Sequence, residues 1–223
     1  MRRTWDELAA AGDTVYVGDP ATGAAELAGL FGRLGADPHG GVCVEVGCGP
    51  GRMTGELALR FDRVLALDVS AAMLELARSN VQVANVEFQL VSGTRLDGVD
   101  DGTADALVCY LVLQHLPGGK AVRAYLREFA RVLSPHGEAF VQVPVLEEGV
   151  RSRAWRALRS LAVPAVELLT RSPSRARAFR GFRLTRAELD GALAGAGLRV
   201  VARDEGPSAY RFSRDLFLRL RRA

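Results

Sequence analysis

Short runs of β-branched and other apolar residues alternate along this chain with longer stretches whose apolar positions have helical spacing. The runs that predict buried strands are Val42–Val46, Arg63–Asp68, Val86–Val91, Ala106–Leu111 and Glu138–Val143. The stretch from 119 to 133 predicts a helix, with its core positions at Val122, Tyr125, Leu126, Phe129 and Val132. With 223 residues, the pattern predicts one α/β domain with a full core.

The ends of the chain add helices and a final pair of strands. Residues 1–35 carry two helical stripes separated by a loop that contains Tyr16, which could line a site or serve as an ordinary core or surface residue. Near the other end, Thr185 and Glu188 form the sequence signature of a capping box, which predicts a helix that ends at Gly197. Strands are expected over 198–202 and 210–220.

The stretch VCVEVGCGPG holds the main candidate chemistry. Gly47, Gly49 and Gly51 follow the first strand at every second position, and a helical pattern begins directly afterwards, from Arg52 to Arg60. Glycines allow a sharp turn and a close approach of the backbone to a ligand. Backbone N–H groups and the positive end of a helix would then face that ligand, as in nucleotide-binding sites. A tight turn without a ligand is the alternative.

An acid, Glu45, stands two residues before the three glycines. The order acid-x-Gly-x-Gly-x-Gly resembles motif I of the class I S-adenosylmethionine-dependent methyltransferases. The second strand ends in Asp68, and the text Asp68-Val69-Ser70 through Met73-Leu74 resembles the D-x-S-x-x-M-L pattern of the same family. A carboxylate at that place can accept hydrogen bonds from both hydroxyls of a ribose. A plain cap at the end of a strand is the other interpretation of Asp68, and Ser70 is expected to cap the helix that follows.

The resemblance implies a Rossmann-like, seven-stranded, mostly parallel sheet with helices on both faces and an antiparallel last strand. It also implies S-adenosylmethionine as cofactor and S-adenosylhomocysteine as product. Ser92 stands where the family has an Asp against the adenine, and Tyr110 replaces a smaller residue. The cofactor-binding residues expected from the resemblance are Glu45, Gly47, Cys48, Gly49, Gly51, Asp68, Val69, Met73, Ser92, Gly93, Tyr110 and Leu111.

The stretch from Tyr110 to Pro117 resembles the family's V-L-x-H-L-P signature and contributes one candidate catalytic residue, His115. An imidazole titrates near neutral pH, so His115 could remove a proton from an acceptor hydroxyl. The other interpretation is a structural residue that hydrogen-bonds the backbone near the cofactor.

The net charge of +3 conceals a local concentration of arginine. Residues 1–150 sum to −8, residues 151–186 to +9, and residues 187–223 to +2. A basic segment would favour an anionic acceptor or contact with an anionic membrane surface. The alternative is a solvated arginine face without a ligand. We expect no nucleic-acid partner, because the segment lacks interleaved aromatic residues and a recognisable reader motif.

The three cysteines (Cys43, Cys48, Cys109) are odd in number and lack a metal-binding spacing, so reduced, inert thiols are expected. His39 lies in a loop and His136 in a turn, and no metal site is predicted. No apolar run of 18 residues and no secretory leader is evident, so a cytoplasmic location is expected.

Together these features predict a single methyltransferase domain over 1–223. Residues 1–40 would form a helical N-terminal lid, and residues 146–183 a basic helical insertion that roofs the acceptor pocket. The acceptor is expected to be a small molecule, methylated on oxygen, with nitrogen and carbon left open. Two other interpretations remain: a non-catalytic S-adenosylmethionine-binding protein, and a nicotinamide-dependent reductase on a related fold. The oligomeric state is not indicated.

Overall fold

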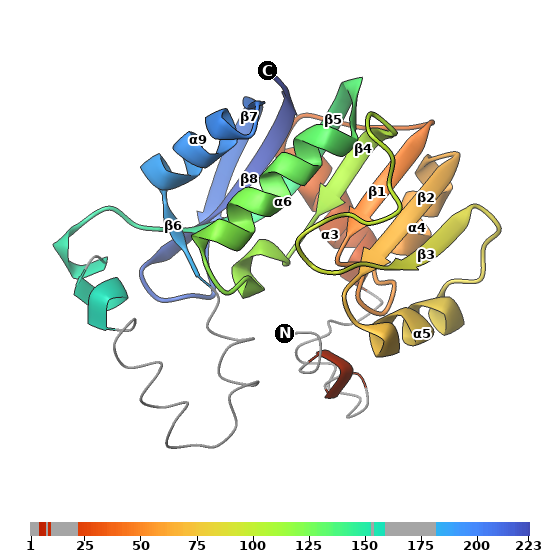
Figure 1. Ribbon diagram of the computed structural model, residues 1–223, viewed down its shortest axis with the longest axis horizontal. Coiled ribbons are helices and arrows are strands. Elements are labelled where there is room, and N and C mark those ends of the chain that lie inside the picture. Colours follow the sequence, from red (N-terminus) through yellow and green to blue (C-terminus); the bar gives the residue numbers. More distant parts are fainter. Residues whose placement is uncertain (1–4, 8, 10–21, 153, 159–181) are drawn as a thin grey trace.

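A computed structural model describes residues 5–7, 9, 22–152, 154–158 and 182–223 (Figure 1). Tyr16, the candidate site residue of the N-terminal loop, lies outside these residues, and so does most of the arginine-rich segment 151–186. The strands form one sheet in the order β3-β2-β1-β4-β5-β8-β7, with β6 paired to β5. Their bounds are β1 Val42–Val46, β2 Arg63–Asp68, β3 Val86–Leu90, β4 Ala104–Cys109, β5 Leu133–Leu146, β6 Leu184–Thr185, β7 Leu198–Pro207 and β8 Ser213–Arg222.

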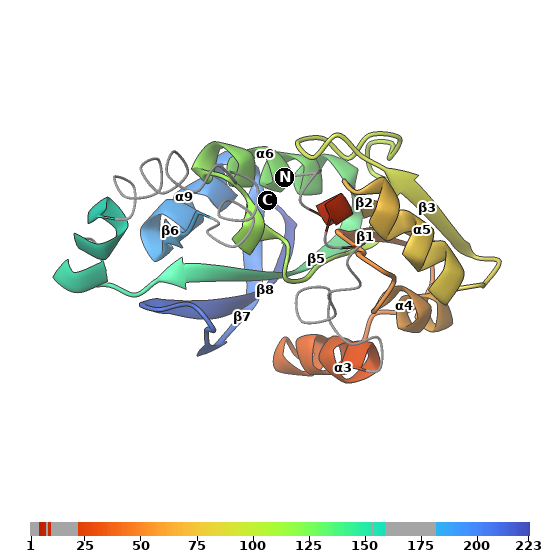
Figure 2. The same cartoon turned by 90° about the horizontal axis from the view of Figure 1, so that it is seen from below.

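Helices cover both faces of this sheet, as Figure 2 shows. Apolar side chains of α3 (Gly23–Arg33), α4 (Thr54–Arg60) and α5 (Ala71–Asn80) pack in one core cluster. Those of α6 (Gly119–Val132) and α9 (Arg186–Gly195) pack in the other. A short 3-10 helix, η2 (Leu113–His115), follows β4. Residues 5–7, 9, 150–152 and 154–158 are also helical.

The fold class is the predicted one: a mostly parallel sheet between two layers of helices. All strand pairs from β3 to β5 are parallel, and β8 runs antiparallel to both β5 and β7. The two-residue β6 adds an eighth strand to the seven expected. The predicted apolar stripe of α6 is buried, and Thr185 and Glu188 form the predicted capping box of α9.

Several strand bounds differ from the sequence prediction for backbone reasons. β4 ends at Cys109 rather than at 111. The φ of 58° at Leu111 is left-handed and lies outside the β region, so the strand cannot continue through this residue. β8 begins at Ser213 rather than at 210, since Phe212 has a φ of 55°. β5 is longer than predicted because its end pairs with β8 over eight residues. No described helix is both long and apolar enough to cross a bilayer.

Candidate functional site

The glycine loop lies where the order of strands along the chain reverses, between β1 and β4. In open parallel sheets, ligands bind beyond the carboxyl ends of the strands at such a switch point. The N–H groups of Gly47 and Cys48 both donate to the carbonyl of Leu67 at the end of β2, at 2.7 and 3.0 Å. The loop is therefore held to the second strand before any ligand binds.

Asp68 connects the glycine loop to the start of α5. Its Oδ2 accepts a hydrogen bond of 2.9 Å from the N–H of Gly49, and its Oδ1 accepts one of 2.9 Å from the N–H of Ser70. Burial raises the pKa of this carboxyl, while these backbone donors lower it. A carboxylate offers about four acceptor positions, so Asp68 keeps capacity for ligand hydroxyls.

Gly49 has a φ of 55°, and a side chain built on it would meet no atom within 4 Å. Gly47 and Gly51 differ in this respect. A Cβ on Gly47 would lie 2.4 Å from Val112, and one on Gly51 would lie 2.9 Å from Val81. The outer two glycines are therefore needed for packing, whereas Gly49 borders open space beside Asp68.

Glu45 is buried, with 5% of its surface exposed, on the strand below the loop. Thr54 Oγ1, at the first turn of α4, donates to Glu45 Oε2 at 2.6 Å. The pKa of Glu45 is raised to about 7, chiefly by burial; the Thr54 hydroxyl lowers the pKa and the nearby Asp68 raises it, and both effects are included in this value. Glu45 therefore joins β1 to α4 and is a proton-binding group near neutral pH.

The end of β4 turns away from the sheet at Leu111. The N–H of Leu111 donates to Oε1 of Gln142 on β5 at 3.2 Å, and Gln142 is 1% exposed. The sequence did not single out Gln142, because a lone glutamine in an apolar strand has no local signature. Tyr110, just before the turn, lies on the α3 side of the sheet, with the Arg52 guanidinium 6.0 Å from its ring centroid. Burial raises the pKa of Tyr110.

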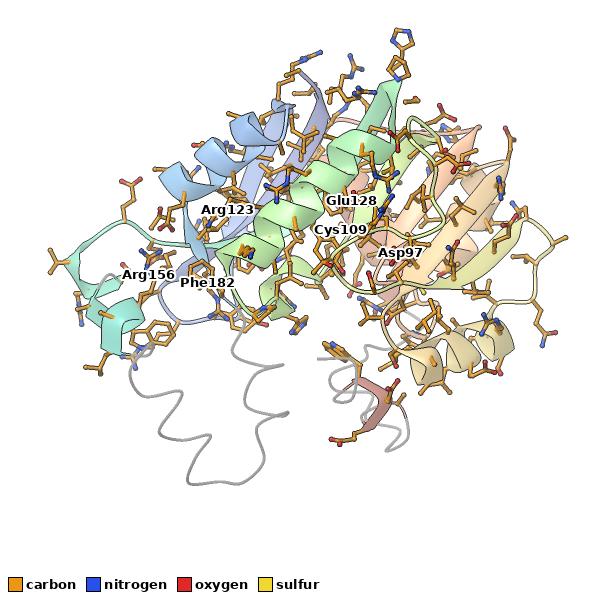
Figure 3. All side chains as sticks on the ribbon, in the orientation of Figure 1. Asp97, Cys109, Arg123, Glu128, Arg156 and Phe182 are labelled. Atoms are coloured by element: carbon orange, nitrogen blue, oxygen red, sulfur yellow. The ribbon has the colours of Figure 1, made fainter. Side chains whose placement is uncertain are left out.

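At the end of β3, the predicted Ser92 and Gly93 lie close to Val69. A Cβ on Gly93 would stand 3.1 Å from Val69 Cγ1. The Ser92 N–H donates to Oδ2 of Asp97 at 2.9 Å (Figure 3). The sequence analysis missed Asp97, which supplies a carboxylate at the corner where the resemblance expected one at position 92.

The N-terminal helical segment also reaches this end of the sheet. Asp6 Oδ1 accepts a hydrogen bond of 2.6 Å from the hydroxyl of Ser70, which in turn accepts one of 3.2 Å from the N–H of Met73 as the predicted N-cap of α5. Trp5 packs against the ring of His115, whose Nε2 lies 3.1 Å from Gln114 Nε2. Neither Trp5 nor Asp6 was predicted as a site residue.

The structure thus places most of the predicted residues along the carboxyl ends of the parallel strands. They lie in the glycine loop beside Asp68, at the end of β3, and at the end of β4. The side chains of two of them are buried: Cys48 in the glycine loop is 4% exposed, and Met73 at the start of α5 is 2% exposed. These two residues therefore contribute to the site through their backbone. All three cysteines are free and buried. Within the described ranges, no three His, Cys, Asp or Glu side chains are grouped as metal ligands would be.

Comparisons with known proteins agree with this geometry. Residues 44–141 match a family model described as a methyltransferase domain. A ubiquinone biosynthesis O-methyltransferase of Xanthomonas oryzae pv. oryzae is 31% identical over 110 residues, covering 47% of this chain and 44% of that protein. A trans-aconitate 2-methyltransferase of Deinococcus radiodurans is 40% identical over 116 residues, covering 51% and 42%. The chain therefore spans less than half the length of these curated relatives.

A solved structure extends the similarity of fold to nearly the whole chain. It is a complex between the Haloferax volcanii Trm112 methyltransferase activator and a methyltransferase, with a TM-score of 0.71 and 22% identity. The match covers 98% of both chains. At this identity the likeness shows the fold.

Proposed function

We propose that the chain, whose residues 44–141 match the methyltransferase-domain model, is a class I S-adenosylmethionine-dependent methyltransferase and transfers a methyl group to a small-molecule acceptor, with oxygen as the favoured atom. The observation that carries the proposal is the bond between Gly49 and Asp68 beside open space. A backbone N–H fixed by a carboxylate that still has acceptor capacity is suited to a nucleoside.

S-adenosylmethionine supplies a methyl group activated by a positively charged sulfur. Asp68 would accept hydrogen bonds from its ribose, and the backbone of the loop from Gly47 to Gly51 would lie along it. Ser92, Gly93 and Asp97 stand where the adenine is expected, and Tyr110 and Leu111 stand towards the acceptor. In their ionised forms the buried carboxyl groups of Glu45 and Asp68 would give the site negative surroundings, which favour a cation.

An oxygen acceptor is supported by the relative named ubiquinone biosynthesis O-methyltransferase. We further propose that two segments enclose the acceptor. One is the N-terminal segment, through Trp5 and Asp6. The other is the insertion after β5, which returns at Phe182 (Figure 3), where the Phe182 N–H donates to the carbonyl of Leu116 at 2.9 Å. Residue His115 lies beneath Trp5, and its role as a base stays a proposal.

The test is calorimetric binding of S-adenosylhomocysteine to the wild type, Asp68→Ala and Gly49→Ala. We expect micromolar binding by the wild type and a loss of at least tenfold in both variants. Gly35→Ala is the matched control, because Gly35 has a φ of 57° and the same open surroundings as Gly49. Both glycine variants carry a left-handed strain of about 1–2 kcal/mol, but only one faces Asp68.

A folded wild type that fails to bind S-adenosylhomocysteine would overturn the proposal, as would equal losses in Gly49→Ala and Gly35→Ala. Acceptor-dependent formation of S-adenosylhomocysteine from S-adenosylmethionine then separates an enzyme from a protein that only binds the cofactor.

A further inference from the structure

Two buried carboxyl groups lie close together below the glycine loop. Glu45 on β1 is paired with Ala66 on β2, and Asp68 lies two residues beyond Ala66. Paired residues of neighbouring strands share a face, and so do residues two apart on one strand, so Glu45 and Asp68 face the same side of the sheet. Only 5% of Glu45 and 8% of Asp68 is exposed. The charge of Asp68 acts on Glu45 and raises its pKa.

One oxygen of Glu45 has no hydrogen-bond partner among the described residues. Thr54 Oγ1 donates to Oε2 at 2.6 Å, and this is the one hydrogen bond that the Glu45 side chain forms in the described part of the chain. Oε1 is not among the unpartnered polar atoms that are hidden from solvent, so it remains accessible although the residue as a whole is buried. Glu45 can therefore meet a ligand at Oε1 and exchange a proton with solvent there.

No cation within the described ranges balances these two acids. Burial, Thr54 and Asp68 determine the pKa of Glu45, whereas burial, backbone donors and Asp6 determine that of Asp68. A buried charge in a protein is ordinarily paired with an opposite charge. The two acids are therefore suited to a ligand that brings a positive charge of its own.

The other titratable groups around Glu45 do not supply this charge. The thiols of Cys43 and Cys48 are buried with raised pKa values, so both stay neutral near pH 7. The remaining groups on this side are paired or neutral: Arg52 of the loop with Glu26 on α3, Arg78 with Glu75 on α5, and Tyr110 on β4, whose pKa is raised by burial. The pKa of Glu45 itself is about 7, so this carboxyl binds and releases a proton near neutral pH.

The methyl donor and the product differ by one positive charge. The sulfur of S-adenosylmethionine is a sulfonium, whereas that of S-adenosylhomocysteine is a neutral thioether, and the amino, carboxylate and nucleoside groups are common to both. A nearby cation favours the ionised form of a carboxyl group, and a neutral ligand that covers the carboxyl favours the protonated form. The two ligands should therefore affect the protonation of a buried acid beside them in opposite directions.

We propose that Glu45, with Asp68 beside it, gives up a proton to solvent when S-adenosylmethionine binds and takes a proton up again once the sulfonium charge has been lost. The inference rests on the proposed function and adds how the same site distinguishes the methyl donor from the product. An ionised Glu45 favours the cationic donor, and a protonated Glu45 does not. Glu45 is thus a specificity-determining residue for the charge of the sulfur.

Calorimetric titration with S-adenosylmethionine and with S-adenosylhomocysteine tests this inference. Titrations in two buffers of different ionisation enthalpy give the number of protons released per ligand bound. The window from pH 5.5 to 7.0 lies below the ordinary α-amino pKa of about 7.7–8.0, so the amino group of either ligand stays charged. We compare the wild type, Glu45→Gln and the control Glu87→Gln, since Glu87 is an exposed acid on β3 that is paired with Arg63.

Between pH 7.0 and pH 5.5 the affinity of the wild type for S-adenosylmethionine should fall at least fivefold, and that for S-adenosylhomocysteine less than twofold. At pH 6.5 the first ligand should release about 0.5–0.8 proton and the second less than about 0.2. Glu45→Gln cannot ionise, so its affinity for S-adenosylmethionine should vary less than twofold over the window and be at least fivefold below that of the wild type at pH 7.0. It should bind S-adenosylhomocysteine as the wild type does, and Glu87→Gln should match the wild type throughout.

Equal proton release with the two ligands would overturn the inference. This comparison uses the wild type alone, so it decides the question even if Glu45→Gln does not fold. A wild-type pH dependence in Glu45→Gln would also overturn the inference, as would the same loss of pH dependence in Glu87→Gln. A folded wild type that binds neither ligand would instead overturn the proposed function, so the two failures are distinguishable.

Discussion

The indole of Trp5 packs edge-on against the imidazole of His115, with ring centroids 5.0 Å apart and ring planes at 82°. The first ring comes from the N-terminal helical segment and the second from η2, directly after β4. Aromatic pairs in this arrangement contribute about 0.5–1.5 kcal/mol beyond the area they bury. The contact therefore holds the N-terminal segment over the end of β4.

This contact can be followed by fluorescence, because the chain has two tryptophans, Trp5 and Trp155. In the Trp155→Phe background, His115→Ala should shift the Trp5 emission to longer wavelength, since the indole loses its partner and becomes more hydrated. The same substitution in the Trp5→Phe background, where only Trp155 emits, should leave the spectrum unchanged. Identical spectra of Trp155→Phe with and without His115 would contradict the packing.

Glu45 should make the protein less stable as the pH rises through neutrality. Its pKa is raised from 4.5 to about 7 in the fold, so between these values the folded state binds more protons than the unfolded state. The free energy of unfolding should therefore fall with rising pH in this window, by about 3 kcal/mol for such a shift.

Urea unfolding at pH 5 and pH 8 tests this dependence. Glu45→Gln keeps an acceptor for Thr54 but cannot ionise, so its stability should change less between the two pH values than that of the wild type. Part of the slope should remain, because burial also raises the pKa of Asp68. An unchanged slope in Glu45→Gln would show that Glu45 does not titrate in the fold.

Arg131 on α6 holds the loop between β3 and β4. Its guanidinium donates to Glu128 and Asp101 and to the carbonyls of Val99 and Leu96 at 2.7–3.2 Å. Arg131→Ala should lower the free energy of unfolding by about 1–3 kcal/mol, because it leaves buried carbonyls without a donor. It should also weaken binding of S-adenosylhomocysteine, since this loop contains Ser92 and Gly93.

Arg127 is the matched control for this experiment, being an exposed arginine one turn earlier on the same helix. Arg127→Ala should change stability by no more than about 0.5 kcal/mol. Chemical unfolding of both variants measures the difference, and equal effects would argue against a specific role of Arg131.

Gly47 should be intolerant of a side chain because of one neighbour. An added Cβ would lie 2.4 Å from Val112 Cγ2, and Gly47 has a φ of 74°. Gly47→Ala should therefore destabilise the fold by about 2–4 kcal/mol, from backbone strain and overpacking together. In the Val112→Ala background the cost should fall to about 1–2 kcal/mol, the strain alone. Thermal unfolding of the wild type, the two single variants and the double variant measures both costs, and equal costs in both backgrounds would contradict the predicted clash.

Local sequence patterns were enough to predict the glycine loop and the layers of strands and helices around it. The alternate glycines followed a buried strand, so the turn needed only backbone freedom at Gly47, Gly49 and Gly51. Asp68 ended the next strand, and parallel strands bring their carboxyl ends to one edge. The cap at Ser70 and the capping box at Thr185 depend on residues within one helical turn, and all of these are readable from neighbours in the chain.

Only the tertiary structure decided which side chains from distant segments lie near the glycine loop and the ends of the strands. Gln142 meets Leu111 across 31 residues, and Asp6 meets Ser70 across 64. Asp215 reaches the face of Tyr110 because β8 is inserted between β5 and β7. Such contacts depend on strand order and register, which set side chains from distant segments side by side. These contacts form only once the strands have paired in the sheet. The periodicity of the local sequence therefore does not predict them.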